Sequence, residues 1–513
     1  MKRVMMGFLD AGKFVSCGVR LFLQLKINNL ENMRLIALTL VCMFPLFLAC
    51  QSDPTELSEN IKNTQFTSQD EELVIRPYTE NPRYWQYQGK PVLLLGATNN
   101  DNLFQSADMK EQLDLLSSIG GNYIRNTMSS RDDGDIWPFH KQANGLYDLE
   151  EWNDQYWKQF EELLKLTAER NIIVQIEVWD RFDFSQEFWQ LNPFNPKNNT
   201  NYSVSASGMA DDYPHHPGGD LQTFFHSLEG MPRYMAELDK IRAYQEKFVK
   251  KMLSYSLNYG HVLYCINNET NTPVEWGKYW INFINEEAGT NLIYATDMFD
   301  QFLEPQSCES CLEALMSPDE YAFVDASQLN WNNGQEHWDN LRWVMGQREK
   351  MTLRPVNSVK VYGKASASGS NGGVKRFCRD VIGGFASVRF HRPATGNGLN
   401  ESAIAAIKSV RKIETVDRFW NLEPQESLLS GRESNEAYLT ANVGETYVLL
   451  FPNSGTVKID LSKHPKIFYA RWISIATGEW GNKFQFEGGG FQEIATPDSK
   501  GWFVVISDRD SFE

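Results

Sequence analysis

The pair Asn268-Glu269 ends a short apolar run, His261-Val-Leu-Tyr-Cys-Ile-Asn-Asn-Glu269, in which hydrophobic residues give way to two amides and one carboxyl. Near-continuous apolar runs of this length are typical of buried parallel strands. Parallel barrels carry their chemistry at the carboxyl ends of such strands. A carboxyl group there, with an apolar strand behind it, can keep a proton near neutral pH and act as an acid or a base. The alternative for Glu269 is a structural carboxylate that caps a helix near Pro273.

Catalysis by paired carboxyl groups, one acting as acid and one as base or nucleophile, requires a second carboxyl group. Acidic residues that end or line expected strands could supply it. They are Glu177, Asp180, Asp297 and Asp325.

Short apolar segments alternate with helical ones from residue 75 onward, which is the pattern of a β/α barrel. Helices are expected over 109–119, 152–170 and 236–258, and a long insertion over about 185–235 is expected to form a wall of the site. Eight strands are expected, at 91–96, 122–126, 172–179, 261–268, 291–296, 321–325, 354–360 and 384–390. The fold class is therefore α/β, a (β/α)8 TIM barrel over residues 76–422.

The sequence pattern changes near residue 425, from alternating strands and helices to short strands separated by turns. Strands are expected at 445–451, 456–461, 468–475 and 501–506. This pattern predicts a small antiparallel β-sandwich over residues 423–513.

The first 50 residues have the form of an export signal. Met33-Arg34 is a basic start, residues 35–48 are apolar, and Ala49-Cys50 closes the segment, which is too short for a membrane span. Cys50 after a small residue resembles a bacterial lipoprotein processing site, so we expect lipidation of Cys50, a translation start at Met33 and a polar tether over 51–75. An ordinary signal peptide cut elsewhere is the alternative.

Composition limits the classes of partner. The net charge of −17 argues against nucleic acid and anionic membrane surfaces. Cys308 and Cys311 are expected to form a local disulfide, and His215-His216 a solvated loop rather than a metal site. No phosphate loop or nucleotide motif is found, so no cofactor and no metal are expected.

Three segments carry a resemblance to a known family. The first strand of the apiosidase-like branch of clan A glycoside hydrolases resembles three short segments of this chain, Tyr84-Trp85, Gly89-Lys-Pro-Val92 and Leu95-Gly96. The last barrel strand of that branch resembles residues 384–393. The members of that branch are surface lipoproteins of Bacteroidetes-like glycan-degradation systems, and the terminal sandwich resembles a domain labelled collagen-binding in them. The resemblance implies an outer-membrane lipoprotein that hydrolyses polysaccharide-derived glycans. It also implies that Glu269 is the acid/base and that Asn268 binds the hydroxyl next to the reacting carbon.

The family's nucleophile, a glutamate at the end of strand seven, is replaced in this chain. The matching segment is Pro355-Val-Asn-Ser-Val-Lys360-Val-Tyr362-Gly363, with Lys360 at the nucleophile position. Lysine cannot form the glycosyl ester, and its positive charge is expected to lower the pKa of Glu269.

Three accounts remain open. Another carboxylate, with Glu177 and Asp297 as the foremost candidates, supplies the second role. Alternatively, the chain has lost hydrolysis and binds glycans. In the third account, Lys360 and Tyr362 transfer protons in a lyase-type β-elimination, with an arginine holding the acidic sugar.

Further residues at expected strand ends are candidates for binding the substrate, together with Asn268. Arg125 has a structural alternative, pairing with a core carboxylate, and Trp179 has another, packing under a helix. The candidates are Asp101, Arg125, Trp179, Lys360, Tyr362, Arg389 and His391.

Overall fold

The computed structural model describes residues 71–215, 221–348, 352–363 and 369–512. The expected signal segment, Cys50, His216 and residues 51–70 of the expected tether lie outside these ranges. Among the described residues, no helix combines the length and the hydrophobicity that crossing a bilayer requires.

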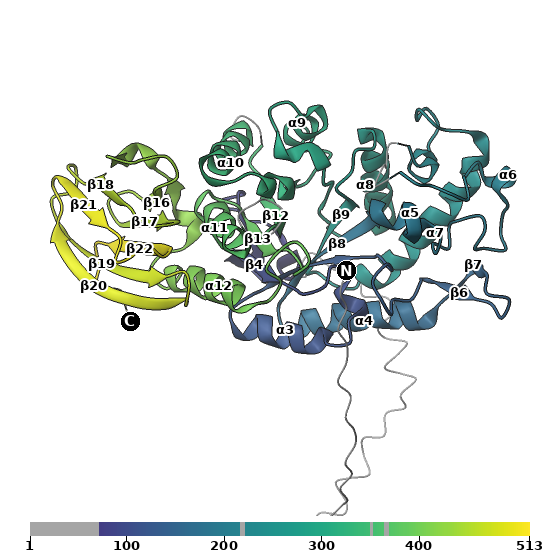
Figure 1. The fold of residues 1–513 in the computed structure, drawn as a ribbon, viewed down its shortest axis with the longest axis horizontal. Coiled ribbons are helices and arrows are strands. Elements are labelled where there is room, and N and C mark those ends of the chain that lie inside the picture. The colour runs from purple at the N-terminus through teal and green to yellow at the C-terminus, as the bar shows by residue number, and fades with distance from the viewer. Residues whose placement is uncertain (1–70, 216–220, 349–351, 364–368, 513) are drawn as a thin grey trace, which may run out of the picture. The chain divides into compact units, whose positions relative to one another are not determined.

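Eight parallel strands form the centre of the chain, as expected (Figure 1). They pair in the order β10-β9-β8-β5-β4-β13-β12-β11, so chain neighbours are also sheet neighbours. Their bounds are β4 Leu94–Ala97, β5 Tyr123–Thr127, β8 Ile173–Asp180, β9 Val262–Asn268, β10 Ala295–Thr296, β11 Val324–Asp325, β12 Val356–Val361 and β13 Ser387–Phe390. Every residue of these strands is buried, which explains why strands such as β9 read as nearly continuous apolar runs. β5, β12 and β13 also bury charged side chains, namely Arg125, Lys360 and Arg389.

The barrel closes between β10 and β11 without a regular ladder. The amide of Ala322 donates to the carbonyl of Ala295 at 2.9 Å, and the hydroxyl of Thr296 donates to the carbonyl of Phe323 at 2.6 Å. These two bonds join the ends of the sheet into a TIM barrel.

The helices surround this sheet, and α3 and α4 run together along one side of it in Figure 1. Asn153 caps α4 by accepting from the amide of Gln155, and the apolar face of the helix is buried. The longer helices are α3 Met109–Ser118, α4 Asp154–Glu169, α7 Asp239–Ser256, α8 Val274–Ala288, α9 Glu309–Met316, α10 Gly334–Arg348, α11 Gly369–Ile382 and α12 Glu401–Ile413. The insertion adds the single turns α5 Gln186–Trp189 and α6 Val204–Ser207.

The strand expected at 91–96 is two strands in different sheets. β3 (Lys90–Val92) belongs to an antiparallel sheet with β1 (Arg76–Pro77) and β2 (Trp85–Tyr87), and only β4 enters the barrel. Trp85 is fully buried, and its indole donates to the side chain of Asn357 on β12 at 2.9 Å. The additional sheet therefore packs the Trp85 side chain against the barrel. A second small hairpin pairs β6 (Phe139–Lys141) with β7 (Tyr147–Trp152).

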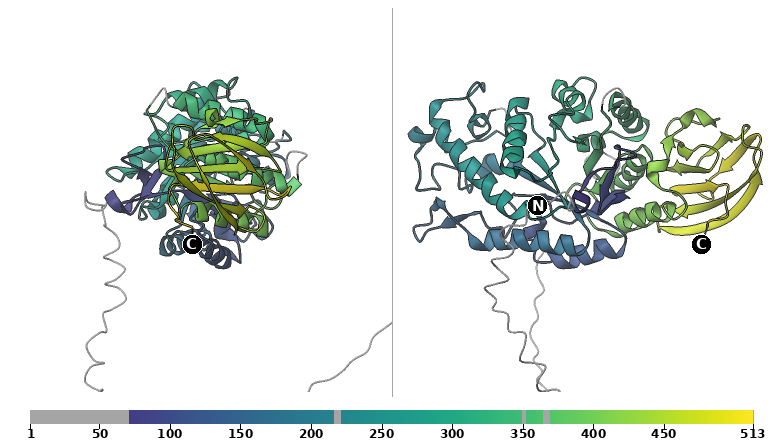
Figure 2. Two further views of the ribbon diagram at one scale, coloured as in Figure 1. Left: turned by 90° about the vertical axis from the view of Figure 1, so that its left-hand side faces the viewer. Right: turned by 180° about the vertical axis from the view of Figure 1, so that it is seen from behind.

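Two antiparallel sheets form the C-terminal domain, as expected (Figure 2). The larger sheet has the order β14-β16-β17-β22-β19-β20, and the smaller has the order β15-β18-β21. Their bounds are β14 Glu423–Pro424, β15 Leu429–Ser430, β16 Tyr438–Asn442, β17 Thr446–Phe451, β18 Thr456–Asp460, β19 Ile467–Ser474, β20 Glu479–Glu487, β21 Phe491–Ala495 and β22 Trp502–Ser507.

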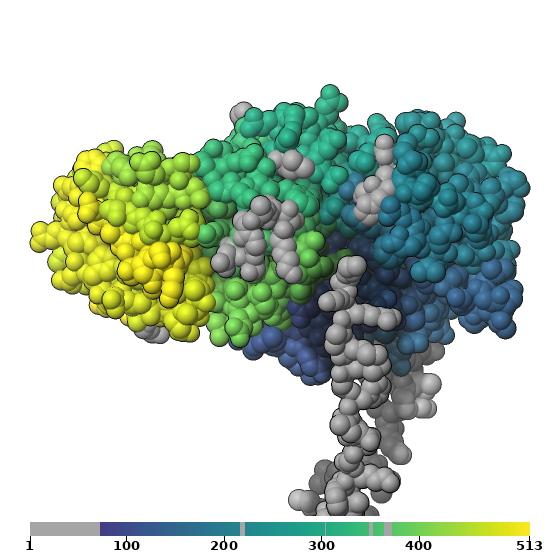
Figure 3. Space-filling model, viewed as in Figure 1, coloured from purple at the N-terminus to yellow at the C-terminus, as the bar shows by residue number. Residues whose placement is uncertain are grey.

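The larger sheet is covered on both faces. Leu449 and Val504 pack toward the smaller sheet, whereas Leu450 and Phe503 pack into the core of the barrel. Figure 3 shows the yellow surface of the sandwich meeting the green surface of the barrel. Burial on both faces explains the unbroken apolar sequence of β17.

The predicted local disulfide is confirmed, since Cys308 and Cys311 are bonded at the start of α9.

Candidate active site at the mouth of the barrel

Glu269 follows β9 directly and lies at the carboxyl end of the barrel, where the sequence predicted it. Its backbone is left-handed, with φ of 54°, which is uncommon for a residue with a side chain. The backbone N–H of the next residue, Thr270, donates a hydrogen bond to the carbonyl of Met298 at 2.7 Å. This sharp turn aims the Glu269 carboxyl at β12, and 14% of its side chain remains exposed.

Lys360 on β12 contacts that carboxyl. Its Nζ lies 2.5 Å from Oε1 of Glu269 and also donates to the side chain of Asn268. The pairing of β12 with β13 shifts register between Ser358 and Val361, the segment that contains Lys360, and such irregularities change the direction of side chains.

The charge of Lys360 changes the acidity of its partner, as the sequence predicted. Burial alone raises the pKa of Glu269, but the ammonium of Lys360 and the guanidinium of Arg181 hold it well below its usual range. Glu269 is therefore an ionised carboxylate at neutral pH.

Tyr362 completes the contacts of Oε1. Its hydroxyl donates to Glu269 at 2.8 Å and accepts from Gln328 at 3.0 Å. Burial and the charge of Glu269 raise the pKa of Tyr362 well above its usual range, so it remains a neutral phenol. Trp331 lies over the Tyr362 ring at 4.9 Å between centroids and is 40% exposed.

Arg181 and Asp300 were missed as site residues by the sequence reading. One nitrogen of Arg181, Nη2, lies 3.6 Å from Oε2 of Glu269 and 3.0 Å from Oδ2 of Asp300. The two carboxylate oxygens can be no further apart than the sum of these distances. Arg181 could have been found because it ends the β8 segment, but Asp300 lies in a loop whose course has no sequence signal.

Glu177 is held in a buried ion pair with Arg125. Both its oxygens accept from Arg125, at 2.6 Å and 2.5 Å, and neither side chain is exposed. Burial lowers the pKa of Arg125, but Asp101 and Glu177 more than offset this and raise it well above its usual range. The structural alternative for Arg125, a core ion pair, is confirmed. Because Glu177 is committed to that pair, this placement does not support it as the second carboxyl.

Asp101 is surrounded by four basic side chains. It lies 2.5 Å from Arg125, 3.5 Å from His391 and 3.7 Å from Arg389. Arg392 lies at 3.1 Å and is partly exposed. Arg125, Arg389 and His391, three of the predicted binding residues, are thus buried around the carboxylate of Asp101.

Asp297 is turned toward the back of the site. Its oxygens accept from the amide and side chain of Asn267 at 2.9 to 3.0 Å, and one contacts the backbone of α8 so closely that a Cβ on Gly277 would lie 2.2 Å from it. Burial raises the pKa of Asp297 to about 7. Asp297 therefore positions the Asn267 segment, and this geometry does not support it as the second carboxyl.

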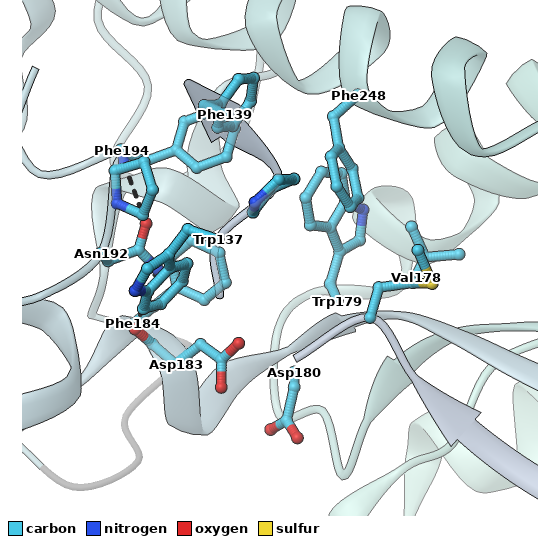
Figure 4. A pocket seen from close by; sticks show the side chains of 13 residues that line it. Trp137, Phe139, Val178, Trp179, Asp180, Asp183, Phe184, Asn192, Phe194 and Phe248 are labelled. Atoms are coloured by element: carbon cyan, nitrogen blue, oxygen red, sulfur yellow. Dashed lines mark hydrogen bonds between the residues drawn. The ribbon is translucent and has the colours of Figure 1, made fainter. Parts of the chain in front are cut away.

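Trp179 lies in an aromatic cluster, packed on Phe248 and Trp280, as its structural alternative predicted. It borders a small aromatic cavity between β8 and the insertion, where Trp137 faces it and Asp180 and Asp183 lie at the edge (Figure 4).

The other acidic candidates are also held elsewhere. Asp180 pairs with Arg131, and Asp325 accepts from Gln175 inside the barrel at 2.8 Å. Within the described ranges, no group of three or more His, Cys, Asp or Glu side chains could hold a metal ion.

Solved structures share this architecture. A glycoside hydrolase family 5 protein from Bacteroides vulgatus matches with a TM-score of 0.56 at 13% identity, over 86% of this chain and 96% of its own. Another structure, described as a glycoside hydrolase, matches with a TM-score of 0.56 at 11% identity, over 86% of this chain and 99% of its own. The fold is a TIM barrel, which this chain shares with these glycoside hydrolases. No family model matches the sequence, and no curated protein does, so the glycoside hydrolase likeness rests on the fold.

Proposed function

We propose that this protein binds a polysaccharide-derived glycan at the mouth of its glycoside hydrolase barrel and does not cleave it by double displacement between β9 and β12. The observation that carries the proposal is the ion pair of Lys360 with Glu269 at 2.5 Å. Double displacement needs a carboxylate nucleophile and a protonated acid. Lys360 occupies the position of the nucleophile, and its positive charge keeps Glu269 ionised, so that Glu269 carries no proton to donate.

Lyase-type elimination is not supported by the same contacts. An ammonium paired with a carboxylate has no lone pair to accept a proton, and Tyr362 holds its proton because its pKa is raised. Neither group is a base at neutral pH.

Sugar binding fits the exposed groups of the mouth. Trp331 presents an exposed aromatic face, and such faces contact the apolar face of a sugar ring. Glu269 and Asp300 accept hydrogen bonds, and Arg392 donates them, so both roles of a sugar hydroxyl can be satisfied.

Hydrolysis with Asp300 as the second carboxyl is the other candidate function. The observation that favours it is that Asp300 and Glu269 contact the same nitrogen of Arg181. Their separation falls near or below the lower end of the roughly 6.5–9.5 Å typical of inverting enzymes.

The two functions are separated by measuring binding and cleavage on one panel of plant and algal oligosaccharides. Calorimetry and product chromatography are run on the parent chain, Glu269→Gln and Asp300→Asn, with the exposed Asp133→Asn as a matched control. Binding without product, weakened in Glu269→Gln, supports the glycan-binding function. Product that disappears in both site variants but not in the control establishes hydrolysis instead.

We also propose that the chain is a lipoprotein of the outer membrane, anchored through Cys50, on the strength of the signal-like segment 33–50. The test is incorporation of labelled fatty acid by the full chain, with Cys42→Ala as the matched control. Labelling that persists in Cys50→Ala would contradict the anchor.

A further inference from the structure

A groove lies between the barrel and the sandwich, and none of the residues that line it belongs to the site described above. α11 and α12 form one wall, and the loops after β17, β19 and β21 form the other. Its lining residues are Val374, Lys375, Ser402, Leu450, Pro452, Asn453, Ile475, Ala476, Ser499, Lys500 and Gly501. The groove exists because the two domains pack together.

The size of the groove suits a small ligand. It offers about 350 Å³, within the range of about 300–1,000 Å³ that is usual for ligand pockets. Leu450 and Ile475 supply apolar surface, and Ser402, Asn453 and Ser499 supply hydrogen-bonding groups. A sugar unit has the same combination of an apolar face and a polar edge.

The charge of the groove is opposite to that of the protein. The chain carries a net charge of −17, yet the described residues that line the groove include Lys375 and Lys500 and no carboxylate. Lys500 is largely exposed and lies 4.0 Å from Asp498, a distance at which an exposed pair contributes little.

Lys375 is held without a negative partner among its described contacts. Its Nζ donates to the neutral side chain of Asn453 at 2.7 Å, and burial together with the nearby Arg379 lowers its pKa. An anion placed beside this ammonium would relieve both effects, since the charge would be neutralised and the hydrogen-bonding capacity filled.

We infer that this groove is a second glycan site, selective for a sugar unit that carries an anionic group, either a uronic acid carboxylate or a sulfate ester. The inference rests on the proposed glycan ligand for its sugar component and on Lys375 and Lys500 for its charge. A site at this junction would let the protein bind an acidic branch of a glycan while another part of the same glycan is bound at the mouth of the barrel.

Calorimetry on the full chain tests the inference with three probes: a trimer of galacturonic acid, a trimer of sulfated galactose and a trimer of neutral galactose. The variants are Lys375→Met, Lys500→Met, the pair together, and Lys375→Arg, which keeps the charge. Lys458→Met, an exposed lysine on β18 outside the groove, is the matched control. A second readout is the reactivity of Lys375 with an amine-specific reagent, followed by mass spectrometry.

At least one acidic trimer is expected to bind more tightly than the neutral one and to protect Lys375 from the reagent. Each single methionine variant is expected to weaken that binding about tenfold, and the double variant about a hundredfold, because each removes one charge-assisted bond. Lys375→Arg and Lys458→Met are expected to bind as the parent does. Which acidic trimer responds identifies carboxylate or sulfate as the recognised group.

The inference is overturned if the double variant binds the acidic trimers as tightly as the parent, or if Lys375 is not protected. Glu269→Gln separates this outcome from the proposed function. Acidic trimer binding that survives Glu269→Gln but not the lysine variants belongs to the groove. If no glycan binds at the mouth while this groove binding remains, the proposed function fails and the groove stands.

Discussion

Lys360 Nζ lies 2.5 Å from Oε1 of Glu269, a contact that joins β12 to β9 across the mouth of the barrel. Lys360 is 1% exposed and Glu269 is 14% exposed, so water screens the pair weakly. The consequence is that Lys360 holds the Glu269 carboxyl in its ionised form.

Substituting both members of this pair should cost less stability than the two single substitutions cost together. Lys360→Met leaves Glu269 without its partner and is expected to lower the free energy of unfolding by about 3–5 kcal/mol. The double variant Lys360→Met with Glu269→Gln should lose less than the sum of the single losses. Denaturant unfolding measures the cycle, with the exposed Lys165→Met as control. Strict additivity would contradict the pair.

Glu269 should stabilise the fold above its unfolded pKa and cease to do so in acid. Its folded pKa lies well below its usual range, whereas an unfolded glutamate titrates near about 4.3. Between these values the unfolded chain binds the extra proton, so stability falls as the pH falls. Thermal unfolding from pH 6 to pH 3 should show a smaller loss in Glu269→Gln than in the parent. Equal losses would mean that Glu269 titrates normally.

Asp297 should show the opposite dependence. Burial raises its folded pKa to about 7, so between about pH 4 and pH 7 the folded chain binds a proton that the unfolded chain lacks. Its contribution to stability therefore decreases as the pH rises through this window. The difference in stability between pH 5 and pH 8 should shrink in Asp297→Asn, while the exposed Asp133→Asn leaves it unchanged. An unaltered pH profile in Asp297→Asn would refute this assignment.

Two glycines inside helices should respond in opposite ways to alanine. A Cβ at Gly277 in α8 would lie 2.2 Å from Oδ2 of Asp297, whereas nothing lies within 4 Å of one at Gly346 in α10. Gly277→Ala should therefore destabilise the fold by about 1–3 kcal/mol, and Gly346→Ala should stabilise it by up to about 1 kcal/mol. Chemical denaturation measures both. Stabilisation by Gly277→Ala would show that Asp297 is not packed against α8.

Trp331 should contribute to glycan binding through its exposed ring. Trp331→Ala is expected to weaken the affinity about tenfold, because stacked aromatic contacts contribute about 0.5–1.5 kcal/mol beyond the area that they bury. Phe491→Ala removes a ring that is 59% exposed on the sandwich and should have no effect. Calorimetry with an oligosaccharide found to bind the parent distinguishes them. Equal affinities for both variants would exclude Trp331 from the site.

Residue type and order along the chain predicted all eight barrel strands, because strands buried on both faces are rich in apolar residues. The same reasoning located Glu269 at the end of β9 and Lys360 near the end of β12. It could not separate β3 from β4, because Lys90–Val92 and Leu94–Ala97 form one continuous apolar run that two different sheets divide.

The roles of the acidic residues depended on distances that no local pattern contains. Glu177 lies within β8 and Asp297 directly follows β10, yet the first pairs with Arg125 on β5 and the second packs behind Asn267. Asp300 reaches Arg181 only because the loop after β10 folds over the mouth. Which carboxylates meet is decided by where a side chain points after its strand ends, and a bulge or a left-handed residue changes that direction.

The chain sequence was thus sufficient to predict the barrel, the sandwich and the positions of Glu269 and Lys360 at or near the ends of their strands. Only the tertiary structure decided how strongly Lys360 and Glu269 interact. Electrostatic energy varies inversely with distance and with the local dielectric, and both are set by the packing of β9 against β12 across the closed barrel. The state of the Glu269 proton is therefore a property of the barrel rather than of either segment.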